Sequence, residues 1–306
     1  NCLRRVNRSK RWHDIRVNKF PDVESVRAAV ASHIRERVGG PDAEARRDAY
    51  VNSPGERWFA ESSPIQRVHL DTAMFIGGIR ALLLQSLHPL AMAGVDQHSD
   101  FRKDPWGRLQ RTAEFIAVTT LGPDDMATAM VNRVLAVHAT VNGKADDGRA
   151  YSALDPHLLR WVHIAEADSF LRAYQTFGEG TLTPDEADEY VRQLGTVAMK
   201  LGATDVPNTV SELDAQIEAF RPELYSTPAA RAVSRYLVLT PPLPIAQRPV
   251  YGAIASAAVA LLPKWSRLPL RLPYLPFTEK MLVKPGGLVI TKALRWAVEP
   301  DQPTKQ

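Results

Sequence analysis

Helix start and stop signals recur along most of the chain, and they constrain its fold more than any other feature of the sequence. An Asp or Thr followed by Pro, a favoured opening of a helix, occurs at Asp104-Pro105, Asp155-Pro156 and Thr183-Pro184. At the third site Glu186 completes a capping box, in which two residues bond each other's free backbone N–H groups. The alternation of apolar and polar residues that is typical of strands is nearly absent. The sequence therefore predicts an all-α fold in one main domain.

Composition excludes several classes of protein. Of the 306 residues, 45% are hydrophobic and 24% are charged, which is close to the average of globular proteins and excludes wholesale disorder. The net charge of +4 is spread along the chain, and no finger, helix-turn-helix or RNA-recognition signature occurs, so no nucleic-acid partner is expected. Cys2 is the only cysteine, which excludes an intramolecular disulfide and a Cys₂His₂ zinc site. Because a lone thiol fits a reducing compartment, we expect a cytoplasmic protein.

We divide the chain into a basic N-terminal helical extension (residues 1–50), a helical domain (residues 51–299) and a disordered tail (residues 300–306). The basic N-terminus lacks the apolar segment of a secretory signal. The longest apolar run, Val250–Leu262, has 13 residues and is too short to span a bilayer. It is expected to form a buried or an interfacial helix. Three cations follow it and leave peripheral membrane contact open: Lys264, Arg267 and Arg271.

The segment Ile79–Leu87 is apolar almost all round, which predicts a helix buried in the core. Gly77 and Gly78 precede it and permit a close approach of the backbone, either to another helix or to a flat ligand. We favour close helix packing.

Two histidines lie on apolar helical faces, within patterns that leave their role open. The stretch Phe101–Gly143 contains two helical patterns that are broken at Gly122-Pro123, and the second pattern places His138 within a stripe of Val131, Val134, Leu135 and Val141. His163 faces Leu159 and Phe170 in a later helix. A buried imidazole needs a partner for each ring nitrogen, and a metal ion can be one of them. From spacing alone, a core histidine and a metal ligand both remain open.

The other six histidines give no sign of a shared site. His88 precedes Pro89 at the end of a buried helix, where a neutral imidazole is expected to cap carbonyl groups. His157 lies in the first turn of a helix and has no evident special role. We assign the remaining four to solvated positions or ordinary amphipathic helices: His13, His33, His69 and His98.

Arg108 and Thr112 are four residues apart and share one face of the first helix in the Phe101–Gly143 stretch. A guanidinium that points inward must meet an acid or an oxygen-rich ligand. The alternative is a surface ion pair with Asp104 or Glu114. No P-loop, HExxH, GxSxG or strand-linked GxGxxG motif is present.

Four segments of the sequence resemble one family when they are taken together: ALLLQSLHPLAMAGV, DPWGRLQRTAEF, VHATVNG and YSALDPHLLRWVHIAEADSF. They are similar to segments of a family of haem-dependent oxygenases. It includes the latex-clearing rubber oxygenases, the MpaB-type oxygenase of fungal meroterpenoid biosynthesis and uncharacterised actinobacterial members, which this chain resembles most. The similarity extends over roughly residues 55–270.

The resemblance implies a helical fold with a globin-like core that holds haem b. His138 matches the axial iron ligand, and Arg108 and Thr112 match an Arg-x-x-x-Thr pair close to the haem. Arg111 stands where the rubber enzyme has a lysine on the distal side. His163 matches a second family histidine, whose role we take as structural or supporting.

One departure from the family bears on the substrate. Rubber cleavage relies on an acidic base upstream of the Arg-Thr pair, yet no glutamate occurs between Glu61 and Glu114. Polyisoprene cleavage is therefore not expected. The leading hypothesis is a haem b-dependent oxygenase that uses dioxygen on another hydrophobic substrate, unsaturated or isoprenoid-like. The alternative is a non-catalytic haem or lipid carrier of the same fold.

Overall fold

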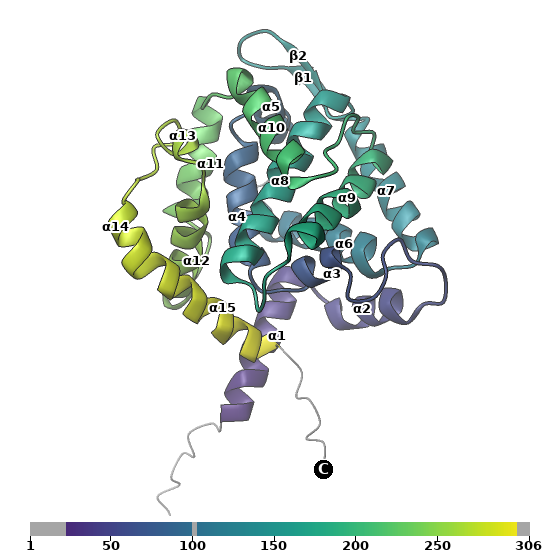
Figure 1. The fold of residues 1–306 in the computed structure, drawn as a ribbon, viewed down its shortest axis with the longest axis vertical. Helices are drawn as coiled ribbons and strands as arrows, with labels where there is room; N and C mark the ends of the chain where they lie inside the picture. The colour runs from purple at the N-terminus through teal and green to yellow at the C-terminus, as the bar shows by residue number, and fades with distance from the viewer. Residues whose placement is uncertain (1–22, 100–102, 299–306) are drawn as a thin grey trace, which may run out of the picture.

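The computed structural model describes residues 23–99 and 103–298 and confirms the all-α fold (Figure 1). A short antiparallel hairpin, β1 (Asn142–Lys144) and β2 (Ala150–Ser152), interrupts the helices. The helices of the first half are α1 (Val23–Gly39), α2 (Ala43–Asn52), α3 (Pro64–His69), α4 (Met74–Gln85), α5 (Pro89–His98), α6 (Pro105–Leu121) and α7 (Asp124–His138). The second half contains α8 (Pro156–Phe177), α9 (Pro184–Lys200), α10 (Val210–Phe220), η1 (Arg221–Glu223), α11 (Pro228–Val238), η2 (Ile245–Gln247), α12 (Arg248–Leu261), α13 (Lys264–Arg267), α14 (Pro276–Thr278), η3 (Glu279–Val283) and α15 (Lys284–Val298).

The predicted helix openings are confirmed by their hydrogen bonds. The carboxylate of Asp104 accepts a bond from the backbone N–H of Gly107, and that of Asp155 accepts one from His157, each at 2.9 Å. Both bonds of the capping box between Thr183 and Glu186 are present. These helix ends form because short polar side chains satisfy backbone donors that the helix itself leaves free.

The core is organised around α8, which is the longest helix described and which buries most of its residues. α4 packs along α8, and α12 covers α4. At Gly77 a methyl group would lie 2.8 Å from Phe170 Cδ1 and 3.2 Å from Phe170 Cα, so the close helix packing predicted there is confirmed. Gly78 has nothing within 4 Å of the same position and plays no part in the contact.

Helices α6 and α7 form a hairpin that is broken at Gly122-Pro123, as predicted. α7 packs chiefly on α6, and α6 packs on α1, α2 and α3. The hairpin is thus held to the molecule mainly through N-terminal helices. α7 ends at His138, so the prediction that Val141 continues the same helical stripe is wrong.

The last elements form a continuous helical rod from Pro276 to Val298, composed of α14, η3 and α15. Figure 1 shows this rod along the outside of the molecule, reaching α1 at its far end. The first turn of α15 consists of Lys284, Pro285, Gly286 and Gly287.

The apolar run that was expected to be buried or interfacial falls in α12, which turns Ile254, Ala255 and residues 257–259 into the core. Among the described residues no single helix is long and apolar enough to cross a membrane. The pair α4 and α5 reaches that length together but bends by 107°. The predicted division at residues 50 and 300 stays a prediction, since its outer parts extend into residues 1–22 and 299–306, outside the described residues. The globin-like arrangement also stays a prediction.

Candidate functional site

A cavity of about 80 Å³ lies among α3, α6, α7, α8 and α9. Its walls are mainly apolar, with Phe115, Ile116, Leu194 and Val197 among the residues that line it. Four side chains that can titrate also line it: His69, His138, His163 and Glu166. A cavity that combines dry walls with several such groups is the usual form of a binding or catalytic site.

His138 and His163 reach the cavity from neighbouring helices. His138 is the last residue of α7, and its Nδ1 is buried without a hydrogen-bond partner. His163 lies in the middle of α8, and its Nε2 is likewise buried and unpartnered. Burial lowers the pKa of both rings, that of His163 to about 4, because an apolar environment disfavours the charged form. Both imidazoles are therefore neutral at pH 7, the form that binds a metal.

His69, at the end of α3, joins them and was missed by the sequence analysis. Its Nδ1 lies 2.9 Å from Thr120 Oγ1, and its Nε2 is buried without a partner. The ring makes edge contacts with Phe170 and Tyr190, and burial lowers its pKa to about 3. No local pattern identifies this residue, because α3 is short and its neighbours come from distant segments.

Glu166 is the acidic group of the cavity, and it too was missed. It follows His163 by three residues on α8, a spacing that places both on one face of the helix. Burial raises the pKa of Glu166 to about 7, and burial together with the Glu166 carboxyl raises that of Tyr190. The Tyr190 hydroxyl is buried without a partner. The sequence does contain a signal that could have identified Glu166, namely a glutamate three residues after a histidine on an apolar helix.

Arg108 lies two turns and Thr112 one turn before Phe115 and Ile116, on the same side of α6, but neither lines the cavity. Arg108 Nη1 donates to Ser99 Oγ at 2.5 Å, and within residues 23–99 and 103–298 it pairs with no carboxylate. Burial, and then repulsion by Arg111, lowers its pKa. Thr112 is exposed, and its hydroxyl donates to the Arg108 carbonyl at 3.0 Å. The prediction that Arg108 and Thr112 share one face of this helix is thus confirmed.

The alternative surface partners of Arg108 are engaged elsewhere. Asp104 lies 3.3 Å from Arg111, whose side chain is 69% exposed, and Glu114 lies 3.6 Å from Arg46. Arg111 is therefore part of a surface ion pair, away from the cavity. Among the described residues, Arg108 remains a partly desolvated guanidinium that has a hydroxyl, but no anion, beside it.

The donor set fits an iron porphyrin in chemistry. Three imidazole nitrogens face one apolar space without partners, and each such buried atom otherwise costs roughly 1–3 kcal/mol. The cavity, at about 80 Å³, is smaller than a macrocycle.

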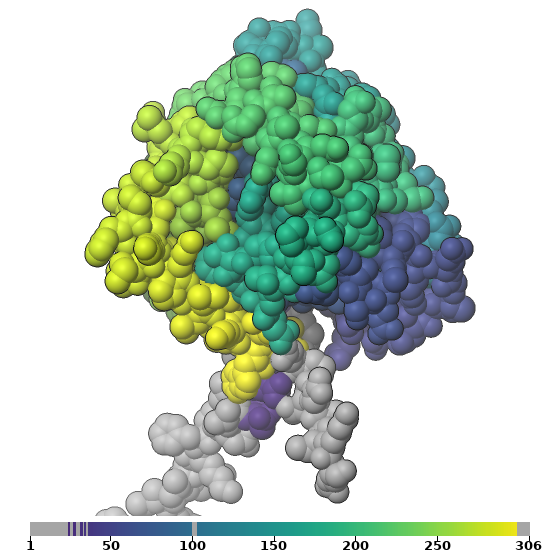
Figure 2. All heavy atoms as spheres, in the orientation of Figure 1, coloured from purple at the N-terminus to yellow at the C-terminus, as the bar shows by residue number. Residues whose placement is uncertain are grey.

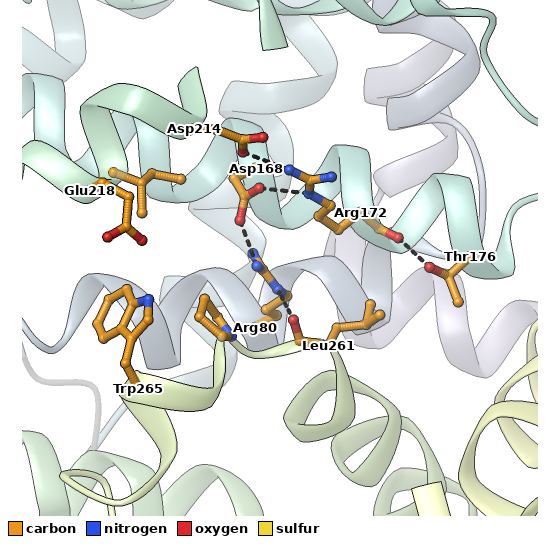
Figure 3. A pocket seen from close by; sticks show the side chains of 10 residues that line it. Arg80, Asp168, Arg172, Thr176, Asp214, Glu218, Leu261 and Trp265 are labelled. Atoms are coloured by element: carbon orange, nitrogen blue, oxygen red, sulfur yellow. Dashed lines mark hydrogen bonds and ion pairs between the residues drawn. The ribbon is translucent and has the colours of Figure 1, made fainter. Parts of the chain in front are cut away.

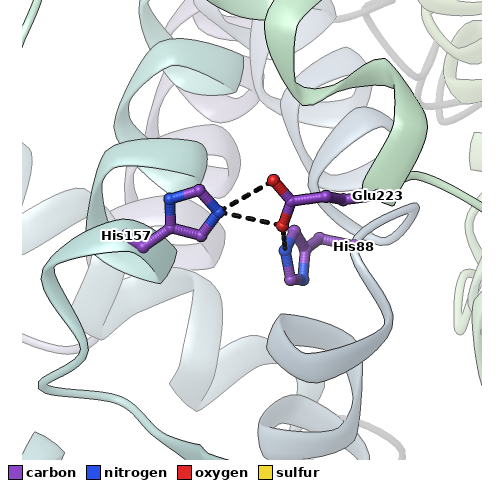
Figure 4. A group of neighbouring side chains, drawn as sticks. All are labelled: His88, His157 and Glu223. Atoms are coloured by element: carbon purple, nitrogen blue, oxygen red, sulfur yellow. Dashed lines mark hydrogen bonds and ion pairs between the residues drawn. The ribbon is translucent and has the colours of Figure 1, made fainter.

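A second group of possible metal ligands lies outside the cavity, where His88, His157 and Glu223 converge (Figure 4). His157 Nε2 lies 2.9 Å and His88 Nε2 lies 3.4 Å from Glu223 Oε2. The predictions that His88 caps carbonyls and that His157 has no special place are therefore wrong. Arg160 Nη2 lies 3.2 Å from His157 Nδ1, and Phe220 stacks on the His157 ring at 4.5 Å. The adjacent guanidinium opposes a bound cation, so this cluster connects three segments through their contacts with the Glu223 carboxylate.

A cleft of about 340 Å³ lies on the opposite face of α8 (Figure 3). Within it, Arg80 donates to Leu261 O at 3.0 Å, Ser169 Oγ at 2.6 Å and Asp168 Oδ2 at 2.5 Å. Arg172 also binds Asp168, at 3.0 Å. All three nitrogens of the buried Arg80 are engaged, so the network holds α4, α8 and α12 together.

Comparison with known proteins identifies a family from most of the chain. Residues 66–297 match the family model described as ER-bound oxygenase mpaB/B'/Rubber oxygenase, catalytic domain. No curated protein and no solved structure gives a significant match. The match contains the cavity with all its titratable residues. The chain accordingly belongs to the family of mpaB-type and rubber oxygenase catalytic domains, a family of oxygenases.

Proposed function

We propose that the protein is a haem b-dependent oxygenase that uses dioxygen on a hydrophobic substrate, unsaturated or isoprenoid-like. One observation carries the proposal: three buried imidazole nitrogens without partners, from His69, His138 and His163, face one apolar cavity. The oxygenase family supplies the reaction class. When bound, haem iron would supply the redox centre at which dioxygen reacts.

His138 would hold the haem iron in this proposal, by its match to the family histidine and by its free Nδ1. His69 is the competing candidate on structural grounds. A metal-binding histidine usually bonds an oxygen through its second nitrogen, and the Nδ1 of His69 already contacts Thr120 Oγ1 while Nε2 is free. His163 then stands in the same cavity as a supporting group.

The remaining residues have distinct proposed roles. Arg108 binds an anionic group at the edge of the cavity, such as a haem carboxylate, because a partly buried guanidinium gains most from an anionic partner. Thr112 holds the helix at that point through its bond to the Arg108 carbonyl. Arg111 stays on the surface with Asp104.

Glu166 replaces the acid that is absent upstream of the Arg-Thr pair. A carboxyl with a pKa of about 7 exists in both forms near neutral pH, so it can take a proton from the substrate and return it. The apolar walls around it exclude water and favour a hydrocarbon substrate.

Absorption spectroscopy of the haem-supplemented protein tests the proposal. We expect a Soret band that is lost or strongly shifted in His138→Ala and retained in His157→Ala, the matched control outside the cavity. If only His69→Ala lost the band, His69 rather than His138 would be the residue that holds the iron. A protein that shows no Soret band under any condition would contradict haem binding.

Dioxygen consumption separates the enzyme from a haem or lipid carrier. With an apolar unsaturated substrate, the wild-type protein is expected to consume dioxygen. Glu166→Gln should slow that consumption by roughly 10²–10⁴-fold while leaving the haem spectrum unchanged. Haem binding without turnover across a panel of unsaturated lipids would favour the carrier.

A further inference from the structure

Large apolar side chains lie on the outer face of the C-terminal rod, which no other described residue covers. Along the loop before the rod and the rod itself, six large apolar side chains are exposed: Leu268 (84%), Leu275 (54%), Phe277 (78%), Met281 (55%), Leu282 (69%) and Val289 (67%). Scattered single residues of this kind are normal on protein surfaces, but a run of them on consecutive elements marks a site of interaction. We call these six side chains the apolar strip.

Three members of the apolar strip recur at helical spacing along the rod. Phe277 and Met281 are four residues apart, and Val289 follows two turns later on the same rod. Figures 1 and 2 show the rod on the outside of the molecule, from its left edge to its lower centre. The other side of the rod packs on α12 and α1, so the strip faces away from the protein.

The charges beside the strip are almost all positive. Between Leu224 and Val298 the sequence has ten lysines and arginines and one acid, Glu279. Glu279 is turned inward, where its carboxylate lies 2.6 Å from Arg267 Nη1 and is only 16% exposed. Five exposed cations flank the strip: Lys264, Arg271, Lys280, Lys284 and Lys292.

We propose that this face of the protein docks on an anionic phospholipid bilayer, with the apolar strip inserted at the level of the headgroups. Exposed aromatic and aliphatic side chains surrounded by lysines are the combination that binds such an interface, since the chains enter the acyl boundary and the cations meet lipid phosphates. The expected interfacial run Val250–Leu262 is not the contact, because α12 is mainly buried.

Charge complementarity distinguishes the bilayer from a second copy of the chain. In a two-fold symmetric dimer built on this face, the same patch would meet itself. The five cations of one copy would then lie opposite those of the other, with no exposed acid of the rod to compensate. An anionic lipid surface satisfies the same cations directly.

Co-sedimentation of the full chain with lipid vesicles tests the proposal, and it does not depend on the oxygenase activity. We expect binding to vesicles of equal parts phosphatidylglycerol and phosphatidylcholine, and little binding to phosphatidylcholine alone. Binding should weaken as salt is raised, because screening weakens the attraction of the lysines. Equal binding to both kinds of vesicle, or binding to neither, would overturn the proposal.

Two double variants probe the two components separately. Lys284→Gln with Lys292→Gln should weaken binding roughly 30-fold, since each cation near an anionic surface changes affinity about five-fold. Phe277→Ser with Leu282→Ser should abolish it. All four side chains are exposed, so the fold is expected to survive, and circular dichroism confirms this before binding is compared.

The matched control is Lys144→Gln with Met199→Ser, which removes one exposed lysine and one exposed apolar side chain on β1 and α9. It should bind like the wild type. If the control lost binding as strongly as the strip variants, the docking face would lie elsewhere. A dimer in size-exclusion chromatography that Phe277→Ser dissociates, without vesicle binding by the wild type, would assign the strip to self-association and overturn the proposal.

Discussion

The side chains of His163 and Glu166 lie one turn apart on α8, and both line the cavity that His138 closes from α7. Burial moves their pKa values in opposite directions, that of His163 down to about 4 and that of Glu166 up to about 7. Between these values both groups are uncharged, because the apolar walls penalise either charge. Groups shifted apart in this way are typical of sites in which one side chain binds and the other transfers a proton.

Replacing Glu166 by Gln is expected to stabilise the protein at neutral pH. The folded pKa of about 7 exceeds the ordinary value of 4.5, so the unfolded chain loses its proton first and folding stability falls as pH rises from 4.5 to about 7. The total loss is about 3 kcal/mol. The amide of Glu166→Gln does not titrate, so the variant does not lose this stability. Its free energy of unfolding in urea should therefore equal that of the wild type at pH 4 and exceed it by the full amount above pH 7. Glu61→Gln, at an exposed position, is the control and should not show the pH-dependent gain.

Replacing His163 by Leu is expected to reduce the sensitivity of the fold to acid. The folded pKa of about 4 lies below the ordinary value of 6.5, so the stability of the wild type is complete above pH 6.5 and is lost as pH falls toward 4. The loss amounts to about 3 kcal/mol. The free energy of unfolding of the wild type should therefore fall by this amount relative to that of His163→Leu as the pH falls across this range. Parallel curves would show that His163 is hydrated in the folded state.

The parts of the fold that are coded locally could be predicted from the sequence. The helix openings at Asp104, Asp155 and Thr183 rest on side chains that bond a backbone group two or three residues away, so they are visible in a short window. The first turn of α15 has no such signal, because Pro285 and the following glycines are typical of a loop. Packing of the rod on α12 and α1 outweighs that local preference.

The candidate site could be predicted only in part, because it is assembled from distant segments. Spacing placed His163 on an apolar face, and the family resemblance selected His138. Both line the cavity. His69 and Glu166 escaped notice, since their special environment is created by side chains that are far away in sequence, such as Thr120 and Tyr190. The meeting of His157 with Glu223 had no local signal for the same reason.

Adding a single methyl group should distinguish the two adjacent glycines of α4. Gly77→Ala places a Cβ 2.8 Å from a ring carbon of Phe170 and 3.2 Å from its backbone, so α4 and α8 must separate at the centre of the core. Destabilisation of about 1–3 kcal/mol is expected. Gly78→Ala meets nothing within 4 Å and should stabilise the helix by roughly 0.5–1 kcal/mol. Thermal unfolding of the two variants compares them directly, and equal effects would contradict the close approach at Gly77.

The ion pair between Arg80 and Asp168 should respond unequally to the loss of its two members. Both side chains are almost fully buried, at 3% and 4% exposure. Asp168→Asn leaves a buried guanidinium without its counter-charge and is expected to cost about 3–5 kcal/mol. Arg80→Met is expected to cost less, because Asp168 keeps Arg172 at 3.0 Å and the methionine fills the space of the aliphatic stem. Chemical denaturation of both single variants and of the double variant measures the coupling. In the double variant no uncompensated charge remains, so it should be more stable than Asp168→Asn alone. If the double variant instead lost the sum of the two single losses, the two charges would act independently.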